Sequence, residues 1–480
     1  MTWRKIRAMA DSLLVYKHKF FWILMAEHKT IAIILAAGKG TRMVSKLPKV
    51  MHTVANQPMI GHVLTATAEL NPSKTFVIVG PGMSEVSRFV KPHKTVLQEE
   101  RLGTADAVKT AMPMIVDTKA ETVLILYGDT PFIHSGTLHK MLQERSSGAT
   151  LVVLGFRPDY PGSYGRLKLN KEGCLEAIIE ANEATAAELE IRLCNSGVMA
   201  VDASHLGALL AEVGNDNIKG EYYLTDIVAL ARLRGMKCCV VEASAEELMG
   251  IDDRVALAEA EHTWQMARRT RAMQEGVTLW DPSSVWFSSD TDIGKDVVIG
   301  PNVVFGPGVS IADNVEVRAF SHLEGVRIEE DVTVGPFVRL RPGAVLKKGS
   351  MVGNFVEVKN SILDKGSKAA HLSYIGDADV GEKTNIGAGT ITCNYDGFNK
   401  NRTVIGKAAF IGSNAALVAP ISIGDGAVVG AGSAIGADVP KDALALSRAK
   451  QINLPGRAQA LRMKLETQKT SVKHKKKSED

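Results

Sequence analysis

The stretch IGKAAFIGSNAALVAPISIGDGAVVGAGSAIG, residues 405–436, places a branched aliphatic residue at every sixth position. The same apolar step runs through residues 293–323 and, after one five-residue step, through residues 328–358. The residues in register are Ile293, Ile299, Phe305, Ile311, Val317, Leu323, Ile328, Val334, Leu340, Leu346, Val352, Val358, Ile405, Ile411, Leu417, Ile423, Val429 and Ile435. A period of six cannot keep one helix face apolar, because it falls between one turn and two. It suits short strands joined by corners, so we predict a left-handed parallel β-helix of hexapeptide repeats.

The N-terminal half has a different pattern. Four apolar runs of strand length alternate with stretches of helical spacing; they are Ile31–Leu35, Thr75–Val79, Thr122–Leu126 and Thr150–Leu154. Continuously apolar strands between helices indicate an α/β domain with a Rossmann-like, mostly parallel sheet covered on both faces. Ligands bind such sheets beyond the carboxyl ends of the strands. We therefore expect a site after Leu35 and after Leu126.

These patterns predict five segments. They are an N-terminal extension (1–29), an α/β domain (30–253), a helical linker (254–275), the β-helix (276–455) and a basic, disordered tail (456–480). Met25 is a natural start, and we expect residues 1–24 to be an upstream extension rather than a signal peptide, because no small-x-small cleavage site follows their apolar run. The hexapeptide register breaks at Asp364–Ile375 and Cys393–Val404, and insertions in a solenoid are expected to project as loops.

Composition excludes several classes of function. The 57 Lys and Arg residues nearly balance the 53 Asp and Glu residues, so nucleic acid is not an expected partner. The five cysteines are scattered, which argues against a disulfide framework and a zinc site and favours a reducing, cytoplasmic location. No apolar run is long enough for a membrane span.

A glycine-rich loop, LAAGKGTRM (residues 35–43), leaves the first strand directly. Its glycines allow backbone N–H groups to approach a phosphate. It is not a P-loop, because Gly40-Thr41-Arg42 stands where Gly-Lys-Ser/Thr is required. It is not a dinucleotide fingerprint either, since Met43 replaces the third glycine.

Leu47-Pro48-Lys49 follows, and the whole stretch resembles the fingerprint of sugar-nucleotide pyrophosphorylases. That resemblance implies a loop that binds a nucleoside triphosphate through Leu35, Ala36, Ala37 and Gly38, and a phosphate-binding Lys49. Asp129 ends the third strand in Tyr127-Gly128-Asp129, where a carboxylate can hold Mg²⁺. The alternative role of Asp129 is a turn or helix cap before Thr130-Pro131.

The β-helix carries its own candidate chemistry. Arg341 and Lys359 predict an anion site, most simply for a phosphate, although surface pairing with Glu357 is an equal alternative. His371 lies in the first register break and can take a proton from an amine at neutral pH. A purely structural hydrogen-bonding role is the alternative for His371.

The span from Thr30 to about Pro455 resembles a bifunctional bacterial family, the N-acetylglucosamine-1-phosphate uridylyltransferases / glucosamine-1-phosphate N-acetyltransferases. Residues 220–226 (GEYYLTD) and 385–397 carry the match most literally. For the uridylyl site, the resemblance implies UTP contacts at Lys49, Gln98, Gly103 and Thr104, sugar contacts at Gly165, Glu180 and Asn195, and Mg²⁺ at Asp129 and Asp252. For the acetyl site, it implies sugar phosphate at Arg341, Lys359, Tyr374 and Asn385, His371 as base, and acetyl-CoA at Ala388, Asn394, Tyr395, Ser413, Ala431 and Arg448.

The same resemblance implies the reactions and the assembly. Glucosamine-1-phosphate would be N-acetylated by acetyl-CoA, and the resulting N-acetylglucosamine-1-phosphate would react with UTP to give UDP-N-acetylglucosamine and pyrophosphate. A homotrimer with acetyl sites between neighbouring β-helices is also implied. Two features depart from the family pattern: residue 252 is Asp where the family usually has Asn, and an N-terminal extension is present.

Three alternative functions fit the sequence less well. The β-helix of a pyrophosphorylase can regulate or assemble without catalysing, but it would then have no reason to carry His371 with the Arg341 and Lys359 pair. A zinc β-helix hydratase needs three histidines, whereas only His322 and His371 fall within the coils. A scaffold with a vestigial first half is disfavoured by the intact loop with Lys49 and Asp129.

Overall fold

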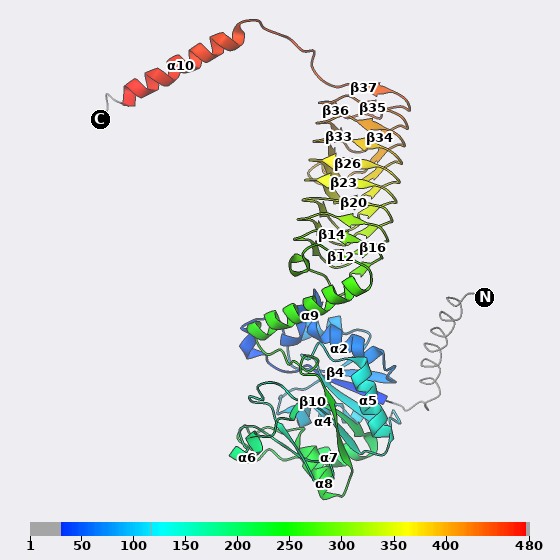
Figure 1. Ribbon diagram of the computed structural model, residues 1–480, viewed down its shortest axis with the longest axis vertical. Helices are drawn as coiled ribbons and strands as arrows, with labels where there is room; N and C mark the ends of the chain where they lie inside the picture. Colours follow the sequence, from blue (N-terminus) through cyan, green and yellow to red (C-terminus); the bar gives the residue numbers. More distant parts are fainter. Residues whose placement is uncertain (1–29, 117, 477–480) are drawn as a thin grey trace, which may run out of the picture. The chain divides into compact units, whose positions relative to one another are not determined.

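The computed structural model describes residues 30–116 and 118–476, and the predicted N-terminal extension (1–29) lies outside them. The chain divides into two compact units (Figure 1). The first comprises the chain up to Arg271 together with Phe287–Ser289, and the second comprises Ala272–Trp286 and the chain from Asp290. Both units bear out the predicted fold class.

The first unit is built on a mixed sheet whose main strand order is β11-β7-β10-β6-β1-β4-β5. The strands are β1 (Thr30–Leu35), β4 (Lys74–Val79), β5 (Lys94–Leu97), β6 (Thr122–Tyr127), β7 (Leu151–Phe156), β10 (Cys194–Asp202) and β11 (Cys238–Ala243). The four predicted strands are present and parallel neighbours flank β1. The sequence did not indicate β10, which runs antiparallel to both β6 and β7.

Helices cover both faces of this sheet, because side chains alternate along each strand. Ile31 and Ile33 of β1 join the core under α4 (Thr104–Val116), α7 (Ala203–Glu212) and α8 (Asp226–Leu233). Ile34 joins the opposite core under α2 (Met59–Ala68), α3 (Ser84–Phe89) and α5 (Ser135–Ser146). The carboxyl ends of β1, β4, β5 and β6 therefore form one edge from which loops can reach a ligand.

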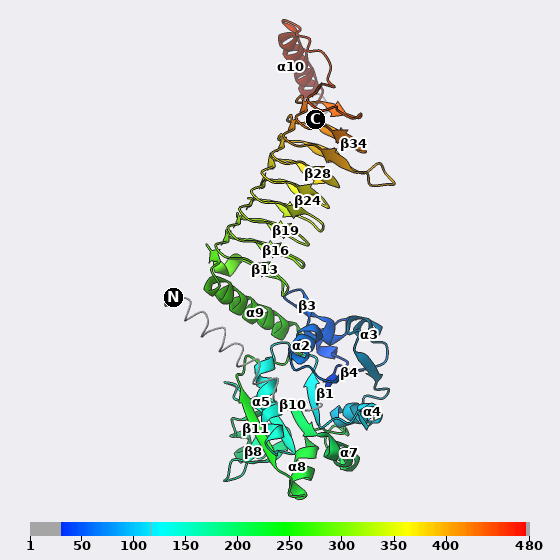
Figure 2. The ribbon, with the colours of Figure 1, turned by 90° about the vertical axis from the view of Figure 1, so that its right-hand side faces the viewer.

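The second unit is a left-handed parallel β-helix that runs from β12 (Thr278–Leu279) to β37 (Leu444–Ala445) (Figure 2). Its strands form three sheets, with every third strand stacked in parallel register. The predicted register residues are buried with one exception, Ile293. Ile293 lies on β13 (Asp292–Ile293), the first strand of its sheet, so no coil covers it on that side.

The two register breaks have different outcomes. Residues 364–375 do not project as a loop: β26 (Lys368–His371) and β27 (Tyr374–Gly376) pair in register with the preceding coil. His371 therefore ends a strand. The second break does leave the coils, between β30 (Ile391–Cys393) and β31 (Thr403–Ile405), as a loop of residues 394–402 (Figure 2).

Two helices complete the described chain. The predicted linker helix is α9 (Arg254–Gln274). Where a disordered tail was expected, the structure has α10 (Arg457–Lys476), which contains neither Gly nor Pro and is rich in good helix formers. Within residues 30–116 and 118–476, no helix is both long and apolar enough to cross a membrane.

Candidate functional site

The glycine-rich loop turns sharply at the carboxyl end of β1. Gly40 has φ +60°, and a Cβ there would lie 2.7 Å from the Cβ of Lys49, so only glycine fits. Among the described residues, no acceptor engages the backbone N–H groups of Ala37, Gly38 or Lys39. These donors point to an anion-binding loop, as the sequence predicted.

Lys49 links the loop to two carboxylates from distant parts of the chain. Its Nζ donates to Asp129 at the end of β6, and it lies 2.8 Å from Oδ1 of Asp252, which precedes α9. The other oxygen of Asp252 lies 2.9 Å from the guanidinium of Arg42. Four charged side chains thus form one continuous cluster. The sequence predicted Lys49, Asp129 and Asp252 but not that Arg42 would join them.

The cluster shifts the acidity of its members. Burial lowers the pKa of Lys49, but Asp129 and Asp252 outweigh it and hold that pKa above the usual range. Burial raises the pKa of Asp252, but the hydrogen bond and charge of Lys49, with help from Arg42, hold it below the usual range. Both groups are therefore charged at neutral pH.

The two carboxylates fit a hard cation. Their oxygens converge on one position, where the Lys49 ammonium now lies, and the Asp252 side chain is 41% exposed and can be reached from solvent. Mg²⁺ is commonly held by one or two carboxylates together with substrate phosphates. No group of three or more His, Cys, Asp or Glu side chains suited to a metal occurs in the described ranges. Substrate phosphates would have to complete the coordination.

Gln98, Gly103 and Thr104 come together beyond β5. Gln98 directly follows that strand and is 4% exposed, and its amide nitrogen donates to the Gly103 carbonyl at 3.0 Å. A Cβ on Gly103 would lie 2.5 Å from the carbonyl oxygen of Tyr222. Thr104 begins α4, and its hydroxyl accepts from the backbone of Leu224.

The predicted sugar contacts also converge. The N–H of Asn195, in β10, donates to the Gly165 carbonyl at 2.8 Å. Glu180 follows β9 (Leu175–Ile179) and accepts a hydrogen bond from the Thr225 hydroxyl at 3.1 Å. The sequence analysis missed Thr225, although it lies inside the quoted segment 220–226.

Tyr127 was also missed as a site residue. It ends β6 two residues before Asp129, its hydroxyl bonds to Thr104, and its ring lies against Gly197. Burial raises the pKa of this phenol well above the usual range. Its position in the segment Tyr127-Gly128-Asp129 could have indicated a role in the site. Its contacts with Thr104 of α4 and Gly197 of β10 could be seen only in the folded structure.

In the β-helix, several predicted residues share one corner of successive coils. In four coils, one predicted residue is followed directly by a corner residue with positive φ. The pairs are His371 and Leu372, Ala388 and Gly389, Ser413 and Asn414, and Ala431 and Gly432. Hydrogen bonds connect the coils along this column: the N–H of Asn414 donates to Ala388 at 2.7 Å and that of Gly432 to Ser413 at 2.8 Å. Arg448 donates to the Ala431 carbonyl at 2.8 Å. We call this column the histidine corner.

Within the histidine corner, His371 has a defined partner. Its Nδ1 lies 2.6 Å from Oδ1 of Asn354, the residue paired with it in the preceding coil. Because an amide oxygen can only accept, Nδ1 carries the proton in the neutral ring, and Nε2 is then the nitrogen with the lone pair. The sequence analysis did not identify Asn354.

Arg341 and Lys359 lie at the next corner, on the other side of the sheet that contains β24 (Glu357–Lys359). Arg341 pairs with Glu357 at 2.9 Å, and the adjacent like charge of Lys400 lowers the pKa of Lys359. Lys400, in the projecting loop, is a further cation that the sequence analysis missed. We call Arg341, Lys359 and Lys400 the cationic corner.

A buried carboxylate underlies the cationic corner. Asp377 is 7% exposed and accepts from the amides of Asn360 and Asn394. Asn394 is therefore turned inward, while Tyr395 is exposed and donates to Gly397 within its own loop. Within a single chain, Asn394 and Tyr395 therefore lie away from the histidine corner.

Tyr374 lies on the sheet between the histidine corner and the cationic corner, whereas Asn385 lies on the sheet that precedes the histidine corner. Tyr374 begins β27, and its hydroxyl lies over Gly376, toward the cationic corner. Asn385 begins β29 (Asn385–Ile386), between Lys368 and Phe410. A single chain therefore distributes the predicted acetyl-site residues over two sheets of the β-helix and the corners beside them.

An exposed aromatic ladder leads directly to the histidine corner. Phe320, Phe337 and Phe355 occupy the positive-φ position in three successive coils, followed by Leu372 beside His371. Their rings stack with centroids 4.9 and 5.1 Å apart, and all three are about half exposed. Contiguous exposed apolar side chains of this kind mark interaction surfaces.

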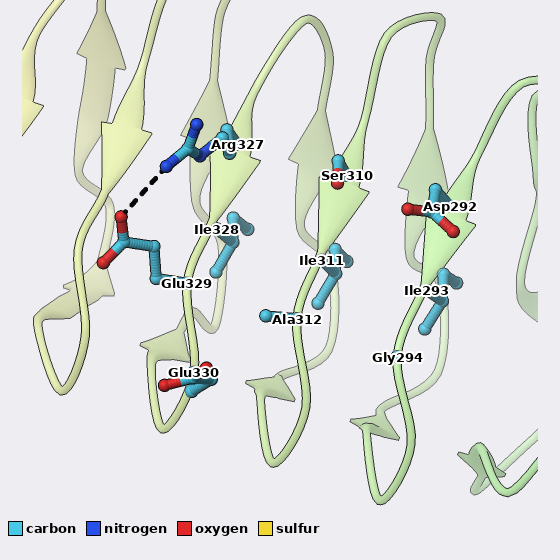
Figure 3. Close-up of a pocket in the computed structure, with 10 residues that line it drawn as sticks. All are labelled: Asp292, Ile293, Gly294, Ser310, Ile311, Ala312, Arg327, Ile328, Glu329 and Glu330. Atoms are coloured by element: carbon cyan, nitrogen blue, oxygen red, sulfur yellow. Dashed lines mark hydrogen bonds and ion pairs between the residues drawn. The ribbon is translucent and has the colours of Figure 1, made fainter.

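A separate pocket lies on the first coils of the β-helix (Figure 3). Asp292, Ser310 and Arg327 line it from stacked strands, and Arg327 pairs with Glu329 at 3.2 Å. None of the predicted site residues lines this pocket. The other charged pair at this pocket joins Glu330 to Lys348, which is not among the lining residues.

Comparison with known proteins covers both units. Residues 32–192 match the model of the MobA-like NTP transferase domain, so the first unit takes a nucleotide substrate. Residues 290–325 match the bacterial transferase hexapeptide model and residues 402–437 the hexapeptide repeat of succinyl-transferase.

Full-length relatives match as well. The bifunctional protein GlmU of Paramagnetospirillum magneticum is 53% identical over 440 residues, covering 91% of this chain and 98% of the relative. The proteins of the same name from Paracoccus denitrificans and Zymomonas mobilis are 50% and 47% identical, covering 92% and 87% of this chain and 99% and 94% of theirs. The predicted resemblance and the predicted bifunctional transferase activity are thereby confirmed, and the chain belongs to the GlmU family.

Proposed function

We propose that the chain makes UDP-N-acetylglucosamine in two steps, with acetyl transfer at the β-helix preceding uridylyl transfer at the α/β domain. The observation that carries this proposal is the similarity to bifunctional relatives along both units. We assign uridylyl transfer to residues 30–253, a linker to 254–275 and acetyl transfer to 276–455.

In the first step, Nε2 of His371 takes a proton from the amine of glucosamine-1-phosphate. The amine nitrogen then attacks the thioester carbonyl of acetyl-CoA, a C–N bond forms, the C–S bond breaks and the CoA thiolate leaves. The Asn354 contact supports this role, because it leaves Nε2 free to accept. Ser413, two coils above His371, would donate to the oxyanion, and one such donor is typically worth about 3–4 kcal/mol.

Substrates of the first step would be held by charge. Arg341, Lys359 and Lys400 would bind the sugar phosphate, with Tyr374 and Asn385 positioning the ring. The mutual repulsion of Lys359 and Lys400 favours this assignment, since a phosphate dianion would relieve it. Ala388, Asn394, Tyr395, Ala431 and Arg448 would contact acetyl-CoA.

In the second step, a phosphate oxygen of N-acetylglucosamine-1-phosphate attacks the α-phosphorus of UTP. The bond from that phosphorus to the bridging oxygen breaks, and pyrophosphate leaves. The nucleophile is already anionic, so positioning and charge neutralisation carry the step. The free N–H groups of Ala37, Gly38 and Lys39 and the Lys49 ammonium would bind the phosphates. Gln98, Gly103 and Thr104 would bind the base, and Gly165, Glu180 and Asn195 the sugar.

Asp129 and Asp252 would hold Mg²⁺ at this site, which supplies charge neutralisation for the triphosphate. Lys49 now bridges both carboxylates. We infer that Lys49 turns from them toward phosphate when nucleotide binds.

We also propose a cytoplasmic homotrimer. The separation of the histidine corner from Asn394 and Tyr395 favours an acetyl site completed by a second copy, and the aromatic ladder supplies an apolar surface beside His371. A neighbouring chain packed on that ladder would bring its own loop to this His371.

The purified chain should be incubated with glucosamine-1-phosphate, acetyl-CoA, UTP and Mg²⁺ while free thiol and pyrophosphate are followed separately. Both products should appear, with pyrophosphate dependent on acetyl-CoA. His371→Ala should abolish thiol release and keep pyrophosphate release from supplied N-acetylglucosamine-1-phosphate. His322→Ala, an exposed histidine outside both corners, is the matched control and should keep both activities. Pyrophosphate without any thiol would mean that the β-helix does not catalyse.

A further inference from the structure

The buried amide of Gln98 is held through its nitrogen by two acceptors. Nε2 donates to Oδ2 of Asp106 at 2.7 Å and to the carbonyl of Gly103 at 3.0 Å. Gln98 follows β5, whereas Asp106 lies in the first turn of α4, so the contact joins a strand end to a helix start. Both hydrogens of the amide are thereby used.

The chemistry of these partners fixes which way the amide points. A carboxylate and a carbonyl can only accept, so the nitrogen must face them and the oxygen must face away. Within the described part of the chain, no donor reaches Oε1 of Gln98, and this oxygen is not among the buried polar atoms without a partner. Gln98 therefore offers its carbonyl, and only its carbonyl, to whatever occupies the space beyond β5.

We propose that Asp106 is a specificity-determining residue that selects uracil over cytosine by locking the Gln98 amide. The inference rests on the proposed function, in which the base of the nucleotide lies against Gln98. Uracil carries a hydrogen on N3 and can donate to Oε1. Cytosine carries a lone pair on N3, which would oppose that of Oε1.

The lock matters because a free glutamine could serve both bases. Turning the amide over would let Nε2 donate to cytosine N3. In this chain the same turn would bring Oε1 against the Asp106 carboxylate and the Gly103 carbonyl. All three groups can only accept hydrogen bonds, so the turned amide is disfavoured. Asp106 touches no reacting atom and acts through Gln98.

The test compares kcat/KM for UTP and CTP with N-acetylglucosamine-1-phosphate as the second substrate. In Asp106→Asn, the new amide can accept from or donate to Gln98, so of the two groups that oppose the turned amide only the Gly103 carbonyl remains. We expect the preference for UTP over CTP to fall about tenfold, mainly through better use of CTP. Asp106→Ala should act in the same direction. Glu100→Gln, at an exposed position in the same loop, is the matched control and should keep the wild-type preference.

The outcomes separate this inference from the proposed function. No use of UTP by the wild-type chain would mean that the proposed uridylyl transfer is wrong. Use of UTP and CTP at similar efficiency by the wild-type chain would overturn the lock alone, whatever the variants do. A folded Asp106→Asn chain whose UTP and CTP efficiencies fall together would also overturn it, since a merely structural residue would behave in that way.

Discussion

Nδ1 of His371 lies 2.6 Å from the amide oxygen of Asn354, one coil earlier in the β-helix. This contact selects the tautomer in which Nε2 is free, the form that a general base requires. Asn354 belongs to the same column as His371, because the coils stack in register. The fold thus supplies the base with an orienting partner.

We expect Asn354→Leu, close in size but unable to accept, to lower kcat for acetyl transfer about 10- to 100-fold with little change in KM, because the imidazole loses its tautomer and orientation. Asn354→Asp restores an acceptor and should retain much more activity. Thiol release under substrate saturation measures this, and uridylyl transfer by the same samples is the internal control. Equal losses in both variants would show that Asn354 only supports the coil.

A second prediction concerns the metal-binding strength of the uridylyl site. Asp252→Asn keeps an oxygen ligand but removes one charge from the pair that surrounds Lys49. Affinity for a divalent cation rises with the number of charged ligands, so the variant should bind Mn²⁺, used in place of Mg²⁺, on the order of tenfold more weakly. Titration of the nucleotide-bound protein, followed by the Mn²⁺ paramagnetic resonance signal, measures this independently of turnover. Asp253→Asn is the adjacent control, and unchanged Mn²⁺ affinity in Asp252→Asn would place residue 252 outside the metal site.

Asp377 predicts an acid-sensitive loop. Burial raises the pKa of Asp377, but the amides of Asn360 and Asn394 and the charges of Lys359 and Lys400 outweigh it, so the pKa lies below the ordinary value of 3.8. A carboxyl pKa lower in the folded state contributes stability that is fully present above about 3.8 and is lost as the pH falls through the folded value. Hydrogen exchange of residues 394–402 should therefore accelerate as the pH falls below 3.8, after correction for intrinsic rates.

In Asp377→Asn this acid step should become smaller, because Asp377 no longer titrates. Asp396, whose pKa is held below its usual range by backbone hydrogen bonds within the loop, still titrates in this variant. The loop should also be less stable at neutral pH by about 1–3 kcal/mol, the range for losing hydrogen bonds to a charged group. Asp396→Asn, an exposed carboxylate in the same loop, is the comparison that keeps Asp377 intact. An acid step of unchanged size in Asp377→Asn would assign the step to Asp396 or to another group.

The sequence predicted those features that depend on a repeating register or on a contiguous motif. The six-residue period placed the buried residues of the coils, and the loop from Leu35 to Met43 was found at the end of β1. Contacts between coils or between distant elements were not predictable in the same way. Asn354 meets His371 only because of a 17-residue offset between coils, and Lys400 reaches Lys359 only because the loop folds back.

The same limit explains the wrong prediction at the first register break. An interruption of the six-residue period has the same appearance in the sequence in two cases: when a strand of the coil is longer than usual, and when a loop projects from the coil. At residues 364–375 the coil absorbs the shift through β26 and β27, whereas residues 394–402 leave it. The contact between Asp106 and Gln98 could not be predicted either, although the two residues are only eight positions apart. The Asp106 carboxylate faces the Gln98 amide only because α4 begins at Thr104.

The aromatic ladder carries the last prediction. Phe337 stacks between Phe320 and Phe355 and is about half exposed, so a single chain leaves the ladder partly uncovered. If a second copy covers the ladder, Phe337→Asp should place an unpaired charge in an apolar interface. Burying such a charge has a large free-energy cost, which disfavours association. We expect the variant to be monomeric by light scattering at concentrations where the wild-type chain is a trimer.

Acetyl transfer should be lost in the monomeric variant, because no neighbouring loop would reach His371, while uridylyl transfer should persist within a single chain. Val304→Asp is the matched control: Val304 is exposed and lies on β15 (Val304–Phe305) of the sheet that contains β24, but its side chain is outside the ladder. A trimeric Phe337→Asp chain with full acetyl transfer would remove the ladder from the interface. A monomeric one that still releases thiol would show instead that one chain holds a complete acetyl site.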